Sequence, residues 1–100
     1  MDKLIKSLSK YPNGTTLIIE WINGCTVLGE IDTIYETDNE LEAEDENYQE
    51  FYVCLLHVTN ILRQSNEMTH FSVGDLIEIS MQNPPSKIML KDQEIVWEHK

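Results

Sequence analysis

The sequence predicts a mainly β fold, in which a short N-terminal helix is followed by antiparallel strands that bend into a small, partly open barrel. Three observations lead to this prediction. Helical periodicity is confined to the first eleven residues, and β-branched and aromatic residues recur in short runs from Thr15 onward. Turn sequences such as Asn-Gly and Pro-Pro separate these runs. A chain of 100 residues with 41% apolar content is expected to form one domain, 1–100, around a single core.

The helix is expected over residues 2–11. Apolar residues recur there at the spacing of one helical face, with lysines on the other face. Asp2 can accept hydrogen bonds from the first free amides of the helix. Pro12 ends the helix, and Asn13-Gly14 supplies the left-handed geometry that turns the chain.

A β-hairpin is expected next, from two strand-like runs at 15–22 and 25–35. Asn23-Gly24 lies between them, which favours a tight type I′ turn with positive φ at two residues. Gly29 in the second run allows a bend or a close approach of another backbone.

The remaining strands follow a long acidic segment. Residues 50–62 form a nearly unbroken apolar run, which is typical of a central strand whose two faces are both covered. A polar connection is expected over 63–70, then a fourth strand over 76–81. Two short runs, 87–90 and 94–97, predict a last hairpin.

Charge is distributed very unevenly along the chain. The 52 residues from Tyr11 to Leu62 contain eleven carboxylates and no lysine or arginine, whereas the flanks hold seven acids and seven cations. The formal charge of −11 therefore belongs to one contiguous half of the chain. Eight of its acids lie within 36–50, where repulsion between like charges favours a mobile acidic loop.

This acidic loop predicts a docking surface for a basic protein. A dense negative patch steers a cationic partner toward it, and the partner is expected to be a nucleic-acid-binding protein that this chain inhibits or regulates. Two aromatic residues near the patch are candidate anchors. The alternative is that the loop is only a solvated segment that keeps the protein soluble. The predicted partner-binding residues are Glu36, Asp38, Glu40, Glu42, Glu44, Asp45, Glu46, Tyr48 and Phe51.

Part of the chain resembles the Sm-like proteins. Gly24, Gly29 and Glu36-Thr37-Asp38-Asn39 resemble the turn glycine, strand glycine and loop sequence of the first Sm motif, and Leu62-Arg63-Gln64 is the nearest match to the second. The resemblance implies a strongly bent, five-stranded antiparallel barrel of the Sm and SH3 type. It also implies a homo-oligomeric ring in which Asn39 and Arg63 contact RNA.

Electrostatics argues against nucleic acid as the partner. Affinity for RNA comes mostly from lysines and arginines that neutralise phosphates, and only seven such residues are present in the chain. Tyr35 and Trp21 could instead act as stacking platforms for bases, although aromatic rings more often fill the core.

Metal sites fit the sequence poorly. Cys25, Cys54, His57 and His70 have the right chemistry for zinc, but residues 54 and 57 of one strand point to opposite faces. The alternating acids of 38–46 are reminiscent of a calcium loop, yet the glycine and the closing glutamate of an EF-hand are missing. No metal and no cofactor are expected.

No catalytic constellation is evident either. Glu30 and Asp32 share one face of a strand and could form an acid–base pair, but no nucleophile or second base accompanies them. The sequence therefore predicts a non-enzymatic protein. No signal peptide or membrane-spanning stretch is apparent, so a cytoplasmic location with reduced, buried cysteines is expected.

Overall fold

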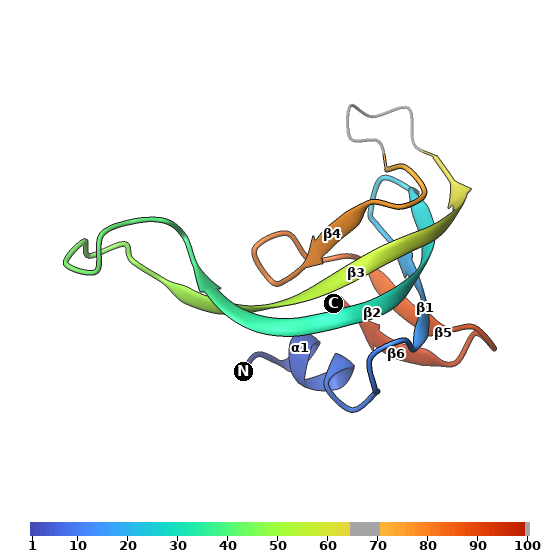
Figure 1. The fold of residues 1–100 in the computed structure, drawn as a ribbon, viewed down its shortest axis with the longest axis horizontal. Coiled ribbons are helices and arrows are strands. Elements are labelled where there is room, and N and C mark those ends of the chain that lie inside the picture. Colours follow the sequence, from blue (N-terminus) through green and yellow to red (C-terminus); the bar gives the residue numbers. More distant parts are fainter. Residues whose placement is uncertain (65–70, 100) are drawn as a thin grey trace.

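The computed structural model describes residues 1–64 and 71–99 (Figure 1). The connection expected over 63–70 therefore lies mostly outside the described residues. No helix in the described part of the chain is long and apolar enough to cross a membrane. The elements are α1 (Lys3–Leu8), β1 (Thr16–Glu20), β2 (Thr26–Asp38), β3 (Glu50–Arg63), β4 (Leu76–Ile79), β5 (Lys87–Leu90) and β6 (Ile95–Glu98).

Helix α1 is shorter than the range expected from the sequence. The Asp2 side chain caps it by accepting a hydrogen bond of 2.8 Å from the amide of Ile5. The helix ends at Leu8, and the amide of Tyr11 then donates to the carbonyl of Leu8 in a tighter turn. Pro12 disfavours the α conformation at Tyr11, the residue before it, but it does not account for the helix ending already at Leu8.

The strands form one six-stranded sheet in the order β4-β3-β2-β1-β5-β6, with every neighbouring pair antiparallel. The mainly β class with one short helix is confirmed, but the five-stranded barrel is not. The sheet stays open, because β4 and β6 lie at its two ends and do not pair with each other.

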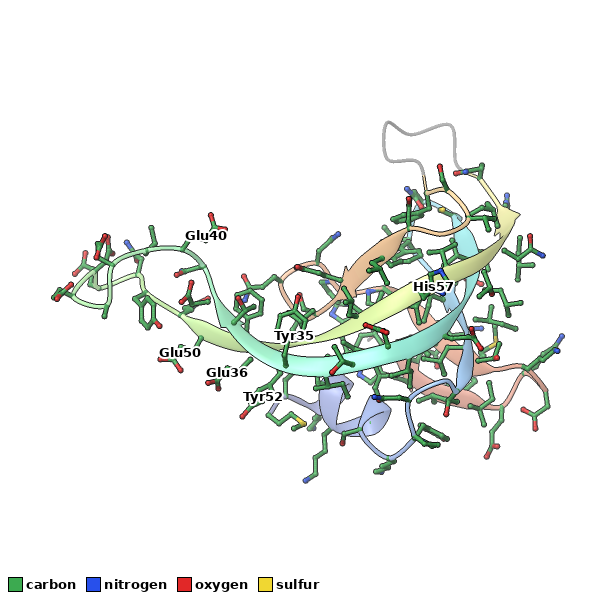
Figure 2. All side chains as sticks on the ribbon, viewed as in Figure 1. Tyr35, Glu36, Glu40, Glu50, Tyr52 and His57 are labelled. Carbon is green, nitrogen blue, oxygen red and sulfur yellow. The ribbon has the colours of Figure 1, made fainter. Side chains whose placement is uncertain are left out.

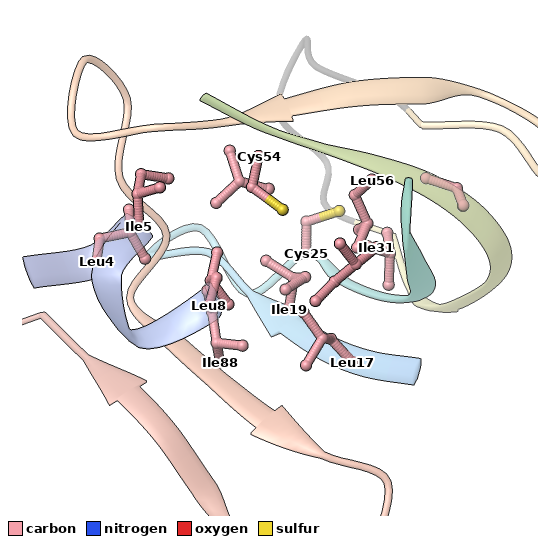
Figure 3. Packing of buried hydrophobic residues seen from close by; sticks show 13 residues of the cluster. Leu4, Ile5, Leu8, Leu17, Ile19, Cys25, Ile31, Cys54, Leu56 and Ile88 are labelled. Atoms are coloured by element: carbon pink, nitrogen blue, oxygen red, sulfur yellow. The ribbon is translucent and has the colours of Figure 1, made fainter. Parts of the chain in front are cut away.

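Helix α1 packs against the core side of the bent sheet. Its apolar side chains cover the part of the core that the open sheet leaves uncovered. The helix contacts both β3 and β6, which lie on either side of the centre of the sheet. Its apolar residues Leu4, Ile5 and Leu8 are fully buried among side chains such as Cys54 and Ile88 (Figure 3). Burying a leucine or isoleucine side chain contributes about 1.5–3 kcal/mol, so this short helix is held mainly by its packing.

The hairpin between β1 and β2 is confirmed, with Thr16 opposite Glu30 and Glu20 opposite Thr26. Its turn differs from the expected two-residue type. The amide of Gly24 donates to the carbonyl of Trp21, and the amide of Trp21 donates to that of Cys25, both at 2.9 Å. Only Gly24 in this turn has a positive φ, of 90°. The longer loop with one left-handed glycine is a common hairpin alternative.

Gly29 lies at a close approach between β2 and β3, as the sequence predicted. A Cβ atom placed on it would lie 2.7 Å from two atoms of the Leu56 side chain and 2.9 Å from the carbonyl oxygen of His57. The β2–β3 register shifts at Leu28/Gly29 and again at Ile31/Thr33. Such irregularities bend a strand, which explains the curvature of the sheet here.

The long strand β3 and the final hairpin are confirmed, but β3 lies second from one end of the sheet and is not covered on both faces, because His57 is exposed. Val53, Cys54, Leu56 and Val58 of β3 are fully buried. Strands β5 and β6 pair around a turn in which Gln93 has a φ of 73°. The acidic segment 36–50 is not a loop throughout, because β2 continues to Asp38 and β3 already begins at Glu50.

Candidate functional site

Strands β2 and β3 continue together beyond the rest of the sheet and form a projecting arm, defined here as residues 35–53. On one side, β1 pairs with β2 only as far as Glu30, and two further hydrogen bonds reach Ile31. On the other side, β4 pairs with β3 only as far as Cys54. The arm is therefore a two-stranded ribbon with no flanking strand in the described part of the chain, and Figure 1 shows it reaching away from the body.

The register of the two strands gives the arm two different faces. Glu36 pairs with Tyr52, and Asp38 pairs with Glu50. Directly opposed residues project to the same side of a sheet, as do residues two apart. These four residues therefore form what we call the acidic face, while Tyr35 lies on the reverse face. Figure 2 shows Glu36, Glu50 and Tyr52 on one side of the ribbon and Tyr35 on the other.

The tip of the arm, residues 39–49, is held together by Asn39. Its amide donates to the carbonyl of Gln49 at 3.1 Å, and its Nδ2 donates to the carbonyl of Asn47 at 2.8 Å. Its Oδ1 accepts longer bonds from the amides of Leu41 and Gln49. Asn39, which the Sm-like resemblance assigned to RNA, is thus a structural residue of the tip.

Two aspartates also shape the tip through hydrogen bonds to nearby backbone. The Asp38 carboxylate accepts a bond from the amide of Glu40, and the Asp45 carboxylate accepts one from the amide of Asn47, both at 2.8 Å. The side chains of Asp and Asn commonly stabilise turns in this way. The acidic segment is therefore built into a definite shape despite the repulsion between its charges.

The negative charge of the arm is not neutralised within the described chain. The arm contains eight carboxylates and no lysine or arginine. No ion pair forms between described residues. The glutamates of the tip are exposed, so their charges face solvent and any approaching partner. The full negative potential of this segment is consequently available for binding.

Tyr48 lies close to this charge. Its hydroxyl donates to Oε1 of Glu50 at 3.2 Å. Desolvation, with smaller contributions from the carboxylates of Glu50 and Asp38, raises the pKa of Tyr48 above its ordinary value. A phenol is already neutral at physiological pH, so Tyr48 acts there as a hydrogen-bond donor, and the raised pKa extends this state to higher pH.

The two predicted anchors do not lie together. Tyr48 reaches Glu50 on the acidic face, whereas Phe51 pairs with Thr37 and belongs to the reverse face. Sequence reasoning missed Tyr52, the half-buried aromatic residue that does lie on the acidic face beside Glu36. Alternation along the strand 50–62 places Tyr52 on the same face as Glu50, but only the pairing with β2 places both beside Glu36 and Asp38.

The residues considered for nucleic acid are dispersed. Asn39 and Arg63 lie at opposite ends of the β2–β3 hairpin, roughly 40 Å apart along the strands. The hydroxyl of Tyr35 donates to Glu78 at 3.1 Å. Desolvation raises the pKa of Tyr35, and the hydrogen bond to Glu78 makes a smaller contribution in the same direction. The ring of Trp21 packs on that of Phe71, with centroids 4.8 Å apart, beside a shallow pocket of about 170 Å³ far from the arm.

The candidate zinc ligands are also separated. Cys25 and Cys54 are buried in the core, while His57 is exposed, so positions 54 and 57 do face opposite sides. Burial raises the pKa of the Cys54 thiol to about 12. His70 lies outside the described residues, and no group of three or more metal-binding side chains occurs within them.

The carboxylates considered for catalysis belong to the body of the sheet. Glu30 is half-buried and pairs with Thr16 on one side and with His57 on the other. Asp32 is exposed at the shift in register between Ile31 and Thr33. Asp32 thus lies at an irregularity, so the regular alternation that would place it beside Glu30 does not apply there.

Comparison with known proteins identifies a matching protein family. The model of the protein family described as "Cognate immunity protein YxxD" matches residues 1–100, the whole length of the sequence. No curated protein and no solved structure matches the chain.

Proposed function

Because the chain belongs to the cognate immunity protein YxxD family, whose members bind a partner toxin, we propose that the arm is the surface that engages this toxin. The arm enters a basic cleft on the toxin, one that otherwise holds nucleic acid, and blocks it. One observation carries the proposal: the arm, a two-stranded ribbon and its tip, carries eight carboxylates and no lysine or arginine.

The physical basis is charge complementarity combined with shape. A cleft that binds phosphates is lined with lysine and arginine, and it attracts a concentrated anionic surface over several ångströms of solvent. A narrow ribbon can enter such a cleft, whereas the broad face of a sheet cannot. The fixed tip lowers the cost of binding, because its backbone is ordered before the toxin arrives.

A charge-neutralised arm tests this proposal. The toxin is first identified by co-purification with the chain, and affinity for the purified toxin is then measured by calorimetry. We expect Glu42→Gln, Glu44→Gln and Glu46→Gln together to weaken binding at least about 10-fold, since each glutamate is exposed at the tip. The chain's ability to inhibit the toxin should fall in parallel.

The matched control removes the same number of charges elsewhere. Asp92→Asn, Glu94→Gln and Glu98→Gln change exposed acids in and beside β6, outside the arm. This variant should bind like the unaltered chain. Equal loss in both variants would show that net charge alone matters and would contradict a role for the arm. Competition by a short RNA oligonucleotide tests whether the blocked cleft is one that binds nucleic acid.

A further inference from the structure

We propose that the toxin adds a β-strand to the open edge of β2 in the arm, and that this strand pairs with the backbone of Glu36 and Asp38 and carries basic residues at alternate positions. The inference rests on the proposed function and specifies how the arm recognises the toxin. Strand addition concerns backbone hydrogen bonds as well as charge. An experiment can therefore contradict strand addition without contradicting the proposed binding of the toxin by the arm.

The direction of the backbone groups follows from the hydrogen bond at the base of the tip. The amide of Asn39 donates to the carbonyl of Gln49, so residue 39 directs its backbone toward β3. Inward and outward residues alternate along an antiparallel strand, and the pairing from Thr33 to Asp38 is regular. The amide and carbonyl groups of Glu36 and Asp38 therefore point away from β3, toward the open edge.

The same edge is occupied nearer the body. Ile31 donates from its amide to the carbonyl of Thr15 and accepts from the amide of Gly14, at 3.0 and 2.7 Å. In the described part of the chain no strand continues this pairing beyond Ile31. Residues 32–38 thus form an edge of about the length of an average strand. A strand added there would lie beside the arm as β1 lies beside the body.

The other edge of the arm offers less room. Along β3, only the residues from Glu50 to Val53 lie beyond the last pair with β4, Cys54 opposite Ile79. Four residues are fewer than the five or six of a typical strand. The edge of β2 is therefore the better template for an added strand.

Charge identifies the occupant as a cationic segment of the toxin. In a strand paired with β2, residues opposite Glu36 and Asp38 project onto the acidic face, about 5 Å from these carboxylates. Basic residues there would be attracted to the carboxylates, and Glu50 lies opposite Asp38 on the same face. A second copy of this chain would instead oppose acids to acids, which disfavours pairing between two arms.

Proline substitution separates backbone pairing from charge. Glu36→Pro removes the outward amide and places a ring at the edge, whereas Glu36→Gln removes only the charge. Proline is tolerated on an edge strand when its amide would face solvent, so the ladder with β3 should survive. Circular dichroism and the unfolding midpoint check this. We expect Glu36→Pro to bind the purified toxin at least about 10-fold more weakly than Glu36→Gln.

Glu50 on the opposite edge provides the matched control. Its amide also points outward, because Glu50 pairs with Asp38. Glu50→Pro and Glu50→Gln should therefore bind equally well. Equal affinities of Glu36→Pro and Glu36→Gln would overturn the inference. The proposed function would still stand if the triple glutamine variant of the tip binds weakly, and it would fail if that variant binds normally.

Hydrogen exchange of the unaltered chain gives a second readout that needs no substitution. The amides of Glu36 and Asp38 should exchange fast in the free protein and at least about 10-fold more slowly in the toxin complex. Unchanged exchange at both positions in a saturated complex would overturn the inference. The inference would also be overturned if these amides exchanged slowly in the free protein and still more slowly at higher protein concentration. A second copy of the chain would then cover the edge.

Discussion

Gly29 shows how a single residue contributes to the curvature of this sheet. No side chain is accommodated there, because the Leu56 side chain and the His57 carbonyl oxygen already occupy the space of a Cβ atom. The backbone of β2 can therefore come close to β3 at the point where the register shifts. The arm leaves the body beyond this bend and the next register shift, at Ile31/Thr33, so its direction depends on both irregularities.

Gly29→Ala is expected to destabilise the protein by about 1–3 kcal/mol, since either the Leu56 side chain or the backbone must move. Chemical denaturation measures the change. In a protein that already carries Leu56→Ala, the additional cost of Gly29→Ala should be smaller. The first substitution relieves the two side-chain contacts of 2.7 Å but not the contact with the carbonyl oxygen. An unchanged denaturation midpoint for Gly29→Ala would mean that β2 and β3 are less closely packed than the structure indicates.

At the level of elements, the tip of the arm depends on polar contacts, whereas Tyr52 and Val53 at the base of the arm pack against or within the core. The strands of the arm are paired with each other only, and its tip carries charges that repel one another. Asn39 compensates by joining the two ends of the tip, residues 39–41 and 47–49, through its side chain. The sequence pattern suggested a mobile loop, because these local hydrogen bonds are not visible in composition or periodicity.

Asn39→Ala should loosen the tip without unfolding the body. The lost hydrogen bonds are exposed and contribute about 0.5–1.5 kcal/mol each at most, so the global midpoint should change little. The amides of Leu41 and Gln49 should exchange faster, and toxin affinity should fall several-fold because the tip must be ordered on binding.

Asn47→Ala is the matched control for this change. It keeps the backbone carbonyl that Asn39 contacts and alters another asparagine of the same tip, one that is more exposed than Asn39. Its exchange rates and toxin affinity should resemble those of the unaltered chain. Similar loosening by both substitutions would contradict the special role of Asn39.

For the whole molecule, the separation of charge is the dominant feature. The formal charge of −11 arises from Tyr11 to Leu62, and eight of these carboxylates lie on the arm at one end of the molecule's longest dimension, which is 43 Å. A molecule with such a distribution has a strongly directional field. A basic toxin would therefore approach the arm first.

The rate of association with the toxin should therefore fall steeply with salt. Raising the ionic strength from about 0.01 to 0.15 M shortens the screening length from about 30 to 8 Å, so the association rate constant should drop at least about 10-fold. Dissociation should change less. Stopped-flow measurements test this, and the triple glutamine variant of the tip should show a shallower slope. A salt effect confined to dissociation would argue against steering by the arm.

Much of the fold was predictable because it depends on neighbours in sequence. The hairpin around Asn23-Gly24, the capped helix that stops before Pro12 and the apolar strand 50–62 follow from turn chemistry, capping and side-chain shape. The turn type and the exact helix length were not predictable, since they depend on how these elements meet the rest of the sheet.

The candidate site was likewise predictable only in part. Which residues carry the charge could be read directly, but Tyr52 and Glu50 joined the acidic face only through the pairing of β2 with β3. That pairing includes three register shifts, and every shift by one residue reverses the face to which the side chains point. No local pattern in the sequence records these shifts.

The sequence by itself determined the segregation of charge and the positions of most strands along the chain, because both depend on residue identity and on short-range backbone preferences. Only the tertiary structure decided that the sheet stays open around α1, that the acidic segment becomes an arm with two faces, and that no strand among residues 1–64 and 71–99 pairs with the edge of β2 from residue 32 to residue 38. These features depend on where pairing between distant strands begins and ends, and packing across the whole molecule sets those limits.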